Sequence, residues 1–452
     1  MKDRAITESI PASPALPSLT YSRYATGVLM VVYMLSFLDR QVLSILAEPI
    51  KLDLGLADWQ IGAVSGLAFA MFYTLVGIPV ARLSERGHRP YIIACAITVW
   101  SASTVLCGFA KSFTHLALAR IGVGTGEAGC TPPALSLIAD YVPRERRSSA
   151  VAIYMAGAPA GVLIGMVLGG IVASHWGWRT AFLVAGAPGV LVAILVALTL
   201  REPRLQLRRE EILQSSSSDQ STSKETFAAT LKVLMGKPTY RLLVSAITMN
   251  AFIQYSVNTF IGSFFFRNHA AEIAEIAVLF GLKPVGFLGI SLGLILGLSG
   301  VAGSIFGGRL SDHFAKRDIR AHMTVPAIGV LVGTPFYIAT FMIDSLPLAL
   351  GLLLIPSTLN AMYYGPAYGI VQGLVKPSMR ATATAVLLLV ISLVGLGLGP
   401  LIVGAVSDLL TSQGLGEAVG LRWAMTLCVL AAIPTAICFL LARKSLQADL
   451  VS

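Results

Sequence analysis

Long stretches of this chain carry no charged side chain, and they limit the possible folds more than any other feature. Charged residues make up 12% of the chain, whereas soluble domains carry about 25%. Several uncharged stretches reach roughly 18 residues or more, the length an α-helix needs to cross about 30 Å of hydrocarbon. A transmembrane β-barrel would instead show segments of about ten residues with alternating polarity. The sequence therefore predicts an all-α membrane protein, and the stretches include 61–80, 91–110, 151–174, 182–200 and 346–374.

Charged residues and breaks that contain Pro or Gly divide the apolar sequence into twelve predicted transmembrane helices. An even number of spans places both termini on one side of the membrane. Basic residues crowd that side, which the positive-inside rule assigns to the cytoplasm. We expect a monomer in a bacterial-type inner membrane with both termini cytoplasmic. The predicted spans are 24–47, 60–81, 90–110, 113–141, 148–175, 179–200, 238–267, 287–309, 321–343, 346–375, 380–408 and 421–442.

Part of the first half recurs in the second. Arg82-Leu83-Ser84-Glu85 follows the second predicted helix, and Arg309-Leu310-Ser311-Asp312 follows the eighth. Two six-helix bundles joined by a long connection are the plan of a parallel-repeat transporter. The connection contains a Ser-rich tract that is typical of a flexible linker. The predicted parts are a cytoplasmic tail (1–23), an N-terminal bundle (24–200), a linker (201–237), a C-terminal bundle (238–442) and a second tail (443–452).

Glycines recur every four residues in two predicted helices. Small residues at this spacing let helix backbones approach closely. We expect close packing at both glycine faces, which would also act as sliding surfaces. The glycines are Gly157, Gly161, Gly165 and Gly169 in the fifth helix and Gly289, Gly293 and Gly297 in the eighth.

Charged side chains inside a bilayer cost about 2.5–3.5 kcal/mol on insertion scales, so each is a functional candidate. Those in the predicted membrane interior all lie in the first half. Asp39 and Arg40 are in the first helix, and Arg120 and Glu127 lie seven residues apart on one face of the fourth. We predict that Asp39 and Glu127 exchange protons, while Arg40 and Arg120 bind an anionic group. The alternative is a structural cluster of ion pairs that locks the two helices together.

The second half offers neutral polar side chains in place of charges. Asn250, Gln254 and Asn258 form a stripe on the seventh helix, and Tyr364 and Tyr368 lie on the tenth. We predict that these side chains bind substrate, with hydrogen bonds between helices as the alternative. A cavity that is charged on one wall and uncharged on the other suits an amphiphile with an anionic head and an apolar body.

Acidic and basic side chains gather in the predicted cytoplasmic loop after the second helix. The pattern partly recurs after the eighth helix, which favours a gate over a simple orientation signal. The predicted cytoplasmic gate comprises Arg82, Glu85, Arg86, Arg146 and Asp312.

The sequence does not indicate an enzyme. It contains no nucleophile–base set, metal site or phosphate-binding loop, so we expect no cofactor and no metal. The five cysteines lie in apolar runs, and the six histidines lie near loops or helix ends. We attribute the net charge of +10 to membrane orientation and expect no nucleic-acid partner.

Motifs in the first half resemble the signatures of the major facilitator superfamily. The loop after the second helix carries Glu85 where that family usually has Asp. The resemblance implies two six-helix bundles that transport by alternating access. The matching residues are Gly77, Arg82, Arg86-Gly87-His88-Arg89, Arg120, Gly124, Gly126, Ala128, Gly161, Gly165 and Gly169-Gly170.

Shorter strings narrow the resemblance. Phe37-Leu38-Asp39-Arg40 and Gly124-Thr125-Gly126-Glu127-Ala128, followed by Ile138-Ala139-Asp140-Tyr141, resemble the spinster family, whose members move sphingoid and lysolipid phosphates. The resemblance implies the family's roles for the four membrane charges. The anion:cation symporter family, which takes up sugar acids, also has an Asp-Arg pair in its first helix and Gly-Glu-Ala near a Pro in its fourth.

We therefore expect a proton-linked secondary transporter of an anion that resembles a lysolipid or sphingoid phosphate. Protons and membrane lipids are its other expected partners. The alternative is a proton-coupled symporter of small organic anions such as sugar acids. A receptor or channel is disfavoured, because buried charges in one half and an internal repeat are typical of alternating access.

Overall fold

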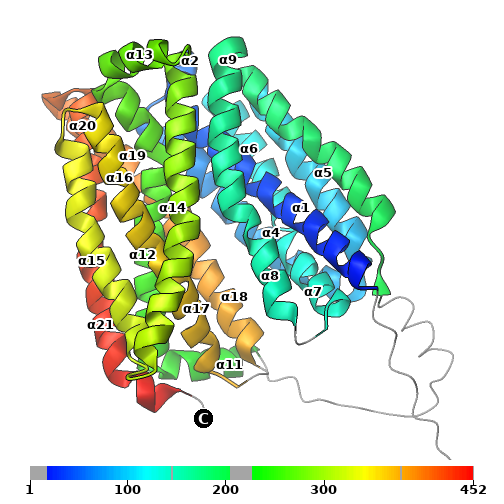
Figure 1. Cartoon of the computed structure of the whole chain (residues 1–452). Helices are drawn as coiled ribbons and strands as arrows, with labels where there is room; N and C mark the ends of the chain where they lie inside the picture. Colours follow the sequence, from blue (N-terminus) through cyan, green and yellow to red (C-terminus); the bar gives the residue numbers. More distant parts are fainter. Residues whose placement is uncertain (1–17, 144–145, 204–226, 377–378, 451–452) are drawn as a thin grey trace, which may run out of the picture.

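The computed structural model of the chain is built from helices. It describes residues 18–143, 146–203, 227–376 and 379–450, so most of the predicted first tail and of the linker lies outside the described residues. Every regular element within these ranges is helical (Figure 1). The fold class predicted from the apolar runs is confirmed.

Two bundles stand side by side in Figure 1. The N-terminal bundle contains α1 (Leu19–Ile45), α2 (Ala47–Leu54), α3 (Asp58–Gly62), the π-helical η1 (Ala63–Leu67), α4 (Ala68–Arg86), α5 (Arg89–Gly108), α6 (Phe113–Glu127), α7 (Thr131–Tyr141), α8 (Arg147–Met155) and α9 (Gly157–Thr199). The C-terminal bundle contains α11 (Phe227–Gly236), α12 (Pro238–Asn268), α13 (Ala270–Leu279), α14 (Pro284–Ala315), α15 (Ala321–Met342), α16 (Leu346–Asn360), the 3₁₀ turn η3 (Ala361–Tyr363), α17 (Tyr364–Gly373), α18 (Arg380–Val390), the π-helical η5 (Ile391–Leu398), α19 (Gly399–Leu410), η6 (Thr411–Leu415), α20 (Glu417–Val429) and α21 (Ala432–Asp449).

Nine helical segments of the described chain are long and apolar enough to cross a membrane, so the protein is a multi-pass membrane protein. One of them, Ser149–Thr199, contains a non-helical glycine, Gly177 (φ 83°), and includes the predicted fifth and sixth spans. The α6–α7 pair and α12 fall outside the nine, yet they coincide with the predicted fourth and seventh spans. All twelve predicted spans therefore coincide with helical segments, although only nine described segments are both long and apolar enough to cross a membrane.

Several predicted spans are interrupted in the structure, and the fourth and the tenth are two examples. The predicted helix 113–141 ends at Glu127 and begins again at Thr131. Pro132 and Pro133 lie in the first turn of α7, where their missing N–H groups cost nothing, although they would break a continuous helix. The predicted span 346–375 contains the 3₁₀ turn η3. A single regular helix was therefore a wrong prediction in both places.

Glycines bring helix backbones together inside each bundle and between the bundles. A Cβ atom built at Gly161 would lie 2.3 Å from the Met34 carbonyl oxygen of α1. One at Gly289 of α14 would lie 2.5 Å from the Met166 carbonyl oxygen of α9. These distances leave no room for a side chain, so the predicted close packing is confirmed at both glycine faces.

The two bundles meet along a seam near the end of the molecule that carries α2 and α13 (Figure 1). A Cβ at Gly62 would lie 2.2 Å from the Pro400 carbonyl oxygen, and one at Gly66 would lie 2.5 Å from that of Leu396. At the other end, the described parts of α7 and α8 and of α17 and α18 have their extensive contacts within their own bundle. Among the described residues, the extensive contacts between the bundles therefore lie at the end that carries α2 and α13, which we call the joined end, and along α9 and α14.

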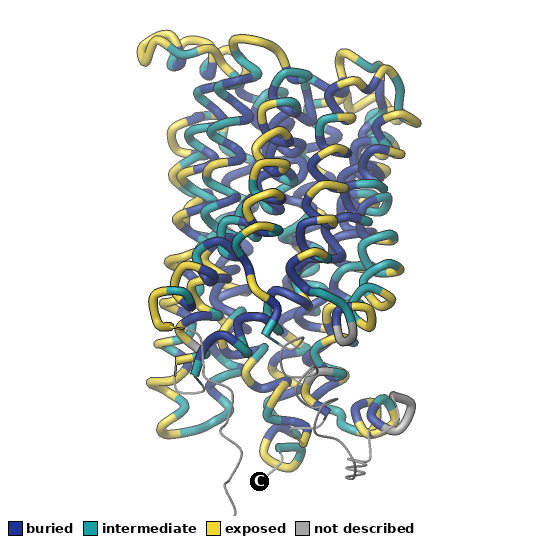
Figure 2. Tube along the Cα trace, turned by 90° about the vertical axis from the view of Figure 1, so that its right-hand side faces the viewer, coloured by how far each residue is buried: buried dark blue, intermediate teal, exposed yellow. Residues whose placement is uncertain are grey.

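Apolar side chains cover the outside of the molecule as well as its core. Leu191 is 70% exposed and Leu198 is 79% exposed. Figure 2 shows exposed residues along the helices through most of the height of the bundle. A surface of this kind is stable in lipid, where apolar side chains do not contact water.

We predict that Gly62→Ala destabilises the joined arrangement of the bundles, because its methyl group would displace the Pro400 carbonyl. Overpacking of this kind costs about 1–3 kcal/mol, so the melting temperature in detergent should fall by several degrees. The control is Gly351→Ala, since a Cβ at Gly351 meets no atom within 4 Å. Equal melting temperatures for the two variants would contradict the prediction.

Candidate functional site

The four charged residues predicted from the sequence come together between α1 and α6. Arg40 is bound to Glu127, with its Nη2 2.5 Å and its Nε 3.0 Å from Glu127 Oε2. The Ser36 hydroxyl donates to the same oxygen at 2.6 Å. Glu127 Oε1 is buried and has no partner among the described residues. One oxygen of this carboxylate therefore carries all of its contacts.

Asp39 lies beside this pair and contacts neither arginine. Thr104 of α5 donates its hydroxyl to Asp39 Oδ2 at 2.9 Å. Asp39 is 1% exposed, and its Oδ1 has no partner within the described residues. A buried carboxyl group with one free oxygen is suited to take up and release a proton.

Arg120 has no carboxylate partner among the described residues. Its Nε donates to the Val64 carbonyl at 3.3 Å, and its guanidinium carbon lies 5.3 Å from the centre of the Phe69 ring. The residue is 2% exposed. A buried cation that no carboxylate neutralises attracts an anion strongly, because low dielectric strengthens the interaction.

The spacing of residues along α6 explains how Arg120 and Glu127 are placed. Arg120 and Glu127 are two turns apart on α6, so they share one face. Gly124 lies between them, and a Cβ there would be 2.4 Å from the Phe69 carbonyl oxygen. Only glycine lets α4 approach closely enough to bring Phe69 over the Arg120 side chain.

The C-terminal bundle contributes neutral polar and aromatic side chains. The Tyr364 hydroxyl donates to Gln254 Oε1 at 2.7 Å, and the Tyr364 and Tyr368 rings are stacked. Asn258 is partly exposed. Tyr255 packs against the buried clusters of both bundles. The structure therefore brings Gln254, Tyr364 and Tyr368 together in the C-terminal bundle.

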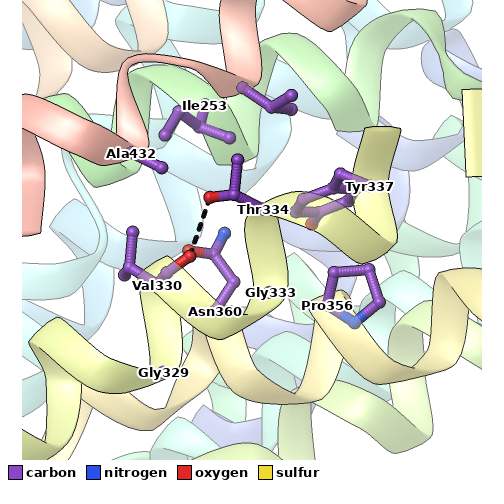
Figure 3. Close-up of a pocket in the computed structure, with 10 residues that line it drawn as sticks. Ile253, Gly329, Val330, Gly333, Thr334, Tyr337, Pro356, Asn360 and Ala432 are labelled. Carbon is purple, nitrogen blue, oxygen red and sulfur yellow. Dashed lines mark hydrogen bonds between the residues drawn. The ribbon is translucent and has the colours of Figure 1, made fainter. Parts of the chain in front are cut away.

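Asn250 is placed differently from the other members of its stripe. It is fully buried in the C-terminal bundle, where its Nδ2 is 3.4 Å from the Asn360 carbonyl oxygen. Figure 3 shows a cavity beside Asn360, lined also by Thr334 and Tyr337. Its volume is about 10 Å³, the space of one water molecule. Asn250 therefore makes the alternative contact between helices, and this cavity is too small for an organic anion.

Aromatic rings around Arg40 were not predicted from the sequence. Its guanidinium carbon lies 4.4 Å from the centre of the Phe69 ring, 5.1 Å from that of Phe37 and 5.7 Å from that of Tyr73. Each distance is within the range of a cation–π interaction. The four-residue spacing of Phe69 and Tyr73 was a usable signal, although aromatic residues in apolar helices are usually packing residues.

A network of ion pairs between the bundles was also missed. Arg267 at the end of α12 contacts Glu48 of α2 and Asp58 of α3, each with its Nη2 at 2.7 Å. Lys51 lies 3.1 Å from Asp58 and 2.8 Å from Glu417 of α20. Glu48, Lys51 and Asp58 are buried. These five residues form what we call the ion-pair network, and it links the two bundles at the joined end.

Further hydrogen bonds between the bundles extend the ion-pair network. Ser407 of α19 donates its hydroxyl to Asp58 Oδ2 at 2.7 Å. The Asp408 carboxylate accepts the N–H groups of Asp58 and Trp59 at 3.0 and 2.8 Å, at the beginning of α3. Orphan N–H groups at a helix start favour such an acceptor. The helix start of one bundle is therefore capped by the other bundle.

The predicted cytoplasmic gate is only partly described. Arg82, Arg146 and Asp312 are exposed and form no ion pair among the described residues. The side chains of Glu85 and Arg86 lie outside the described structure. The gate therefore stays a prediction. Nearby, Arg89 is fully buried and pairs with Glu202 and, at 2.7 Å, with Asp140, which ties α5 to the beginning of the linker.

Comparisons with known proteins agree with this architecture. A model of the Major Facilitator Superfamily matches residues 29–400. An MFS-type efflux pump of Mycolicibacterium smegmatis is 33% identical over 428 residues, 94% of each chain. Protein spinster homolog 1 of Homo sapiens is 26% identical over 416 residues, 90% of this chain and 78% of its own. The crystal structure of a bacterial homologue of the human lysosomal transporter Spinster, inward-facing and unoccupied, is 31% identical with a TM-score of 0.83, covering 96% of this chain and 100% of that one.

We predict that Arg267→Ala opens the joined end, because it leaves the buried carboxylates of Glu48 and Asp58 without their shared cation. Removing one partner of a buried pair costs about 3–5 kcal/mol. Spin labels at Leu52 of α2 and Leu279 of α13, both exposed at this end, should show a new population at longer distance.

Arg179→Ala is the matched control, since Arg179 pairs with Asp53 of its own bundle and both side chains are more than 40% exposed. It should leave the distance distribution unchanged. A distribution in Arg267→Ala that equals that of Arg179→Ala would show that the ion-pair network does not hold the bundles together.

Proposed function

This chain belongs to the major facilitator superfamily as a spinster-like transporter, not an enzyme, and we propose that it moves an amphiphilic anion in a proton-linked cycle. The substrate we infer is a lysolipid- or sphingoid-phosphate-like molecule. The observation that carries the proposal is Arg120, a buried cation with no carboxylate partner among the described residues.

The two walls of the site support an amphiphile. The N-terminal wall offers two guanidinium groups for an anionic head. The C-terminal wall offers Gln254 and stacked tyrosines, which carry no charge and can pack against an alkyl chain while their hydroxyl groups bind polar atoms.

The Arg40–Glu127 pair supports proton linkage. An anion that binds Arg40 competes with Glu127 Oε2 for the same guanidinium group. A buried carboxylate that loses its cation is costly unless it takes up a proton. Asp39, with its free Oδ1, offers a second place for a proton. We therefore infer that anion binding and protonation of Glu127 occur together.

The cycle we propose alternates between two arrangements of the bundles. The arrangement described here has its ion-pair network at one end, and its fold is similar to that of a bacterial homologue in an inward-facing conformation. We infer that the opposite end is open and faces the cytoplasm, with both termini, and that the protein works as a monomer in an inner membrane. Arg82, Glu85, Arg86, Arg146 and Asp312 would then close the open end in the other arrangement.

The substrate class is tested by ligand-induced thermal stabilisation of the purified protein. We expect stabilisation by a lysolipid phosphate and not by glycerol phosphate or sugar acids. Arg120→Ala should weaken binding about 10- to 100-fold, because a hydrogen bond to a charged group contributes about 1.5–3 kcal/mol. Arg443→Ala is the control. Arg443 is 43% exposed and lies in α21, which contributes no residue to the proposed site. Stabilisation by a sugar acid alone would move the protein to the small-anion symporters.

Proton linkage is tested in proteoliposomes with an imposed pH gradient. We expect Glu127→Gln combined with Asp39→Asn to abolish accumulation driven by the gradient while substrate exchange at equal pH persists. Glu275→Gln is the control, because Glu275 is exposed on α13. Accumulation that persists unchanged in the double variant would rule out these carboxylates as the proton carriers.

A further inference from the structure

Phe69 is the one described ring that both guanidinium groups of the site approach. Its centre lies 4.4 Å from the guanidinium carbon of Arg40 and 5.3 Å from that of Arg120. The ring is fully buried. Two nearby cations repel each other, and the electron-rich face of an aromatic ring offsets part of that repulsion without adding a negative charge.

The turn before Phe69 supplies the second contact to Arg120. The segment η1 is π-helical, and the N–H of Ala68 bonds to the Ala63 carbonyl. In a regular α-helix this N–H would bond to the Val64 carbonyl. That carbonyl is therefore free of its usual partner, and it accepts the Nε–H of Arg120 at 3.3 Å.

Both contacts hold Arg120 with groups that carry no net charge. A carboxylate would hold the side chain equally well, but an incoming anion would have to displace it. A ring face and a carbonyl fix the position and leave the full positive charge available. Holding a binding group in place before the ligand arrives increases affinity, because less ordering is required on binding.

We propose that Phe69 is a positioning residue of the anion site, which keeps Arg40 and Arg120 turned toward a single head group. The proposal rests on the proposed function and adds a specificity to it. A phosphate monoester has enough oxygens to bind both guanidinium groups, whereas a carboxylate is satisfied by one of them in a bidentate contact. Phe69 therefore favours a phosphate head over a carboxylate head on the same alkyl chain.

The test compares binding of a lysolipid phosphate and of a fatty acid of equal chain length in variants of Phe69. Phe69→Leu keeps an apolar side chain, although a smaller one, and removes the ring face. We expect about a 30-fold loss of affinity for the phosphate, with the fatty acid little changed, as cation–π contacts in a desolvated site are worth about 2 kcal/mol. Phe69→Tyr keeps the ring face and should restore the preference. Phe69→Met serves as a second ringless variant if Phe69→Leu does not fold.

Phe182→Leu is the packing control. Phe182 is fully buried in the same bundle, where its ring contacts Trp178 and no cation. It should lower the melting temperature and leave both affinities unchanged. Transport assays provide a second readout, since a positioning role should raise KM for the phosphate and leave kcat nearly constant.

The outcomes separate this proposal from the proposed function. A ringless variant that keeps the wild-type preference, or loses affinity equally for both ligands, overturns the role of Phe69, as does failure of Phe69→Tyr to restore it. The binding loss in Arg120→Ala is measured independently. If Arg120→Ala binds the phosphate as wild type does, the proposed anion site itself is wrong.

Discussion

Charge inside hydrocarbon has to be compensated, and this constraint organises the parts of the molecule that matter for transport. Arg40 and Glu127 compensate each other. Asp39 is compensated by a single hydroxyl, and Arg120 by a carbonyl and a ring. The site is therefore left with one cation, Arg120, and one carboxyl group, Asp39, that form no ion pair among the described residues. Their compensation is completed by a ligand or by a change in protonation, which is why binding and proton transfer are linked in the function we propose.

The same constraint explains why the bundles stay joined at one end. Arg267 of the C-terminal bundle lies in a buried region where its only described carboxylate partners, Glu48 and Asp58, belong to the N-terminal bundle. Separating the bundles leaves these groups to be solvated by water instead. The network is therefore stable when closed, and it exposes charges that water can solvate when open. Because its charges can be compensated either by each other or by water, the ion-pair network is suited to a protein whose bundles adopt two arrangements.

The sequence predicted features that are local in the chain. Uncharged runs predicted the helices, and the spacing of Arg120 and Glu127 predicted their common face. The predictions failed where three-dimensional proximity decides. Arg267 and Glu48 are 219 residues apart, and both lie at helix ends where charges usually mark topology only. Asn250 belongs to a polar stripe, yet its burial against Asn360 depends on the break in the tenth span. The break between α6 and α7 is followed closely by Pro132 and Pro133, which is a local signal in the sequence.

One stretch of the chain, from Asp58 to Phe69, contacts the ion-pair network, the seam and the charged site in turn. Asp58 binds Arg267 at its beginning, Gly62 packs on Pro400 along its length, and Phe69 lies over the two guanidinium groups at its end. The stretch is helical from α3 through η1 into α4, so its parts move together. A movement that separates Gly62 from Pro400 therefore also shifts the ring and the carbonyl that hold Arg120. In the function we propose, affinity for the anion and closure of the joined end are thus coupled through the position of this stretch.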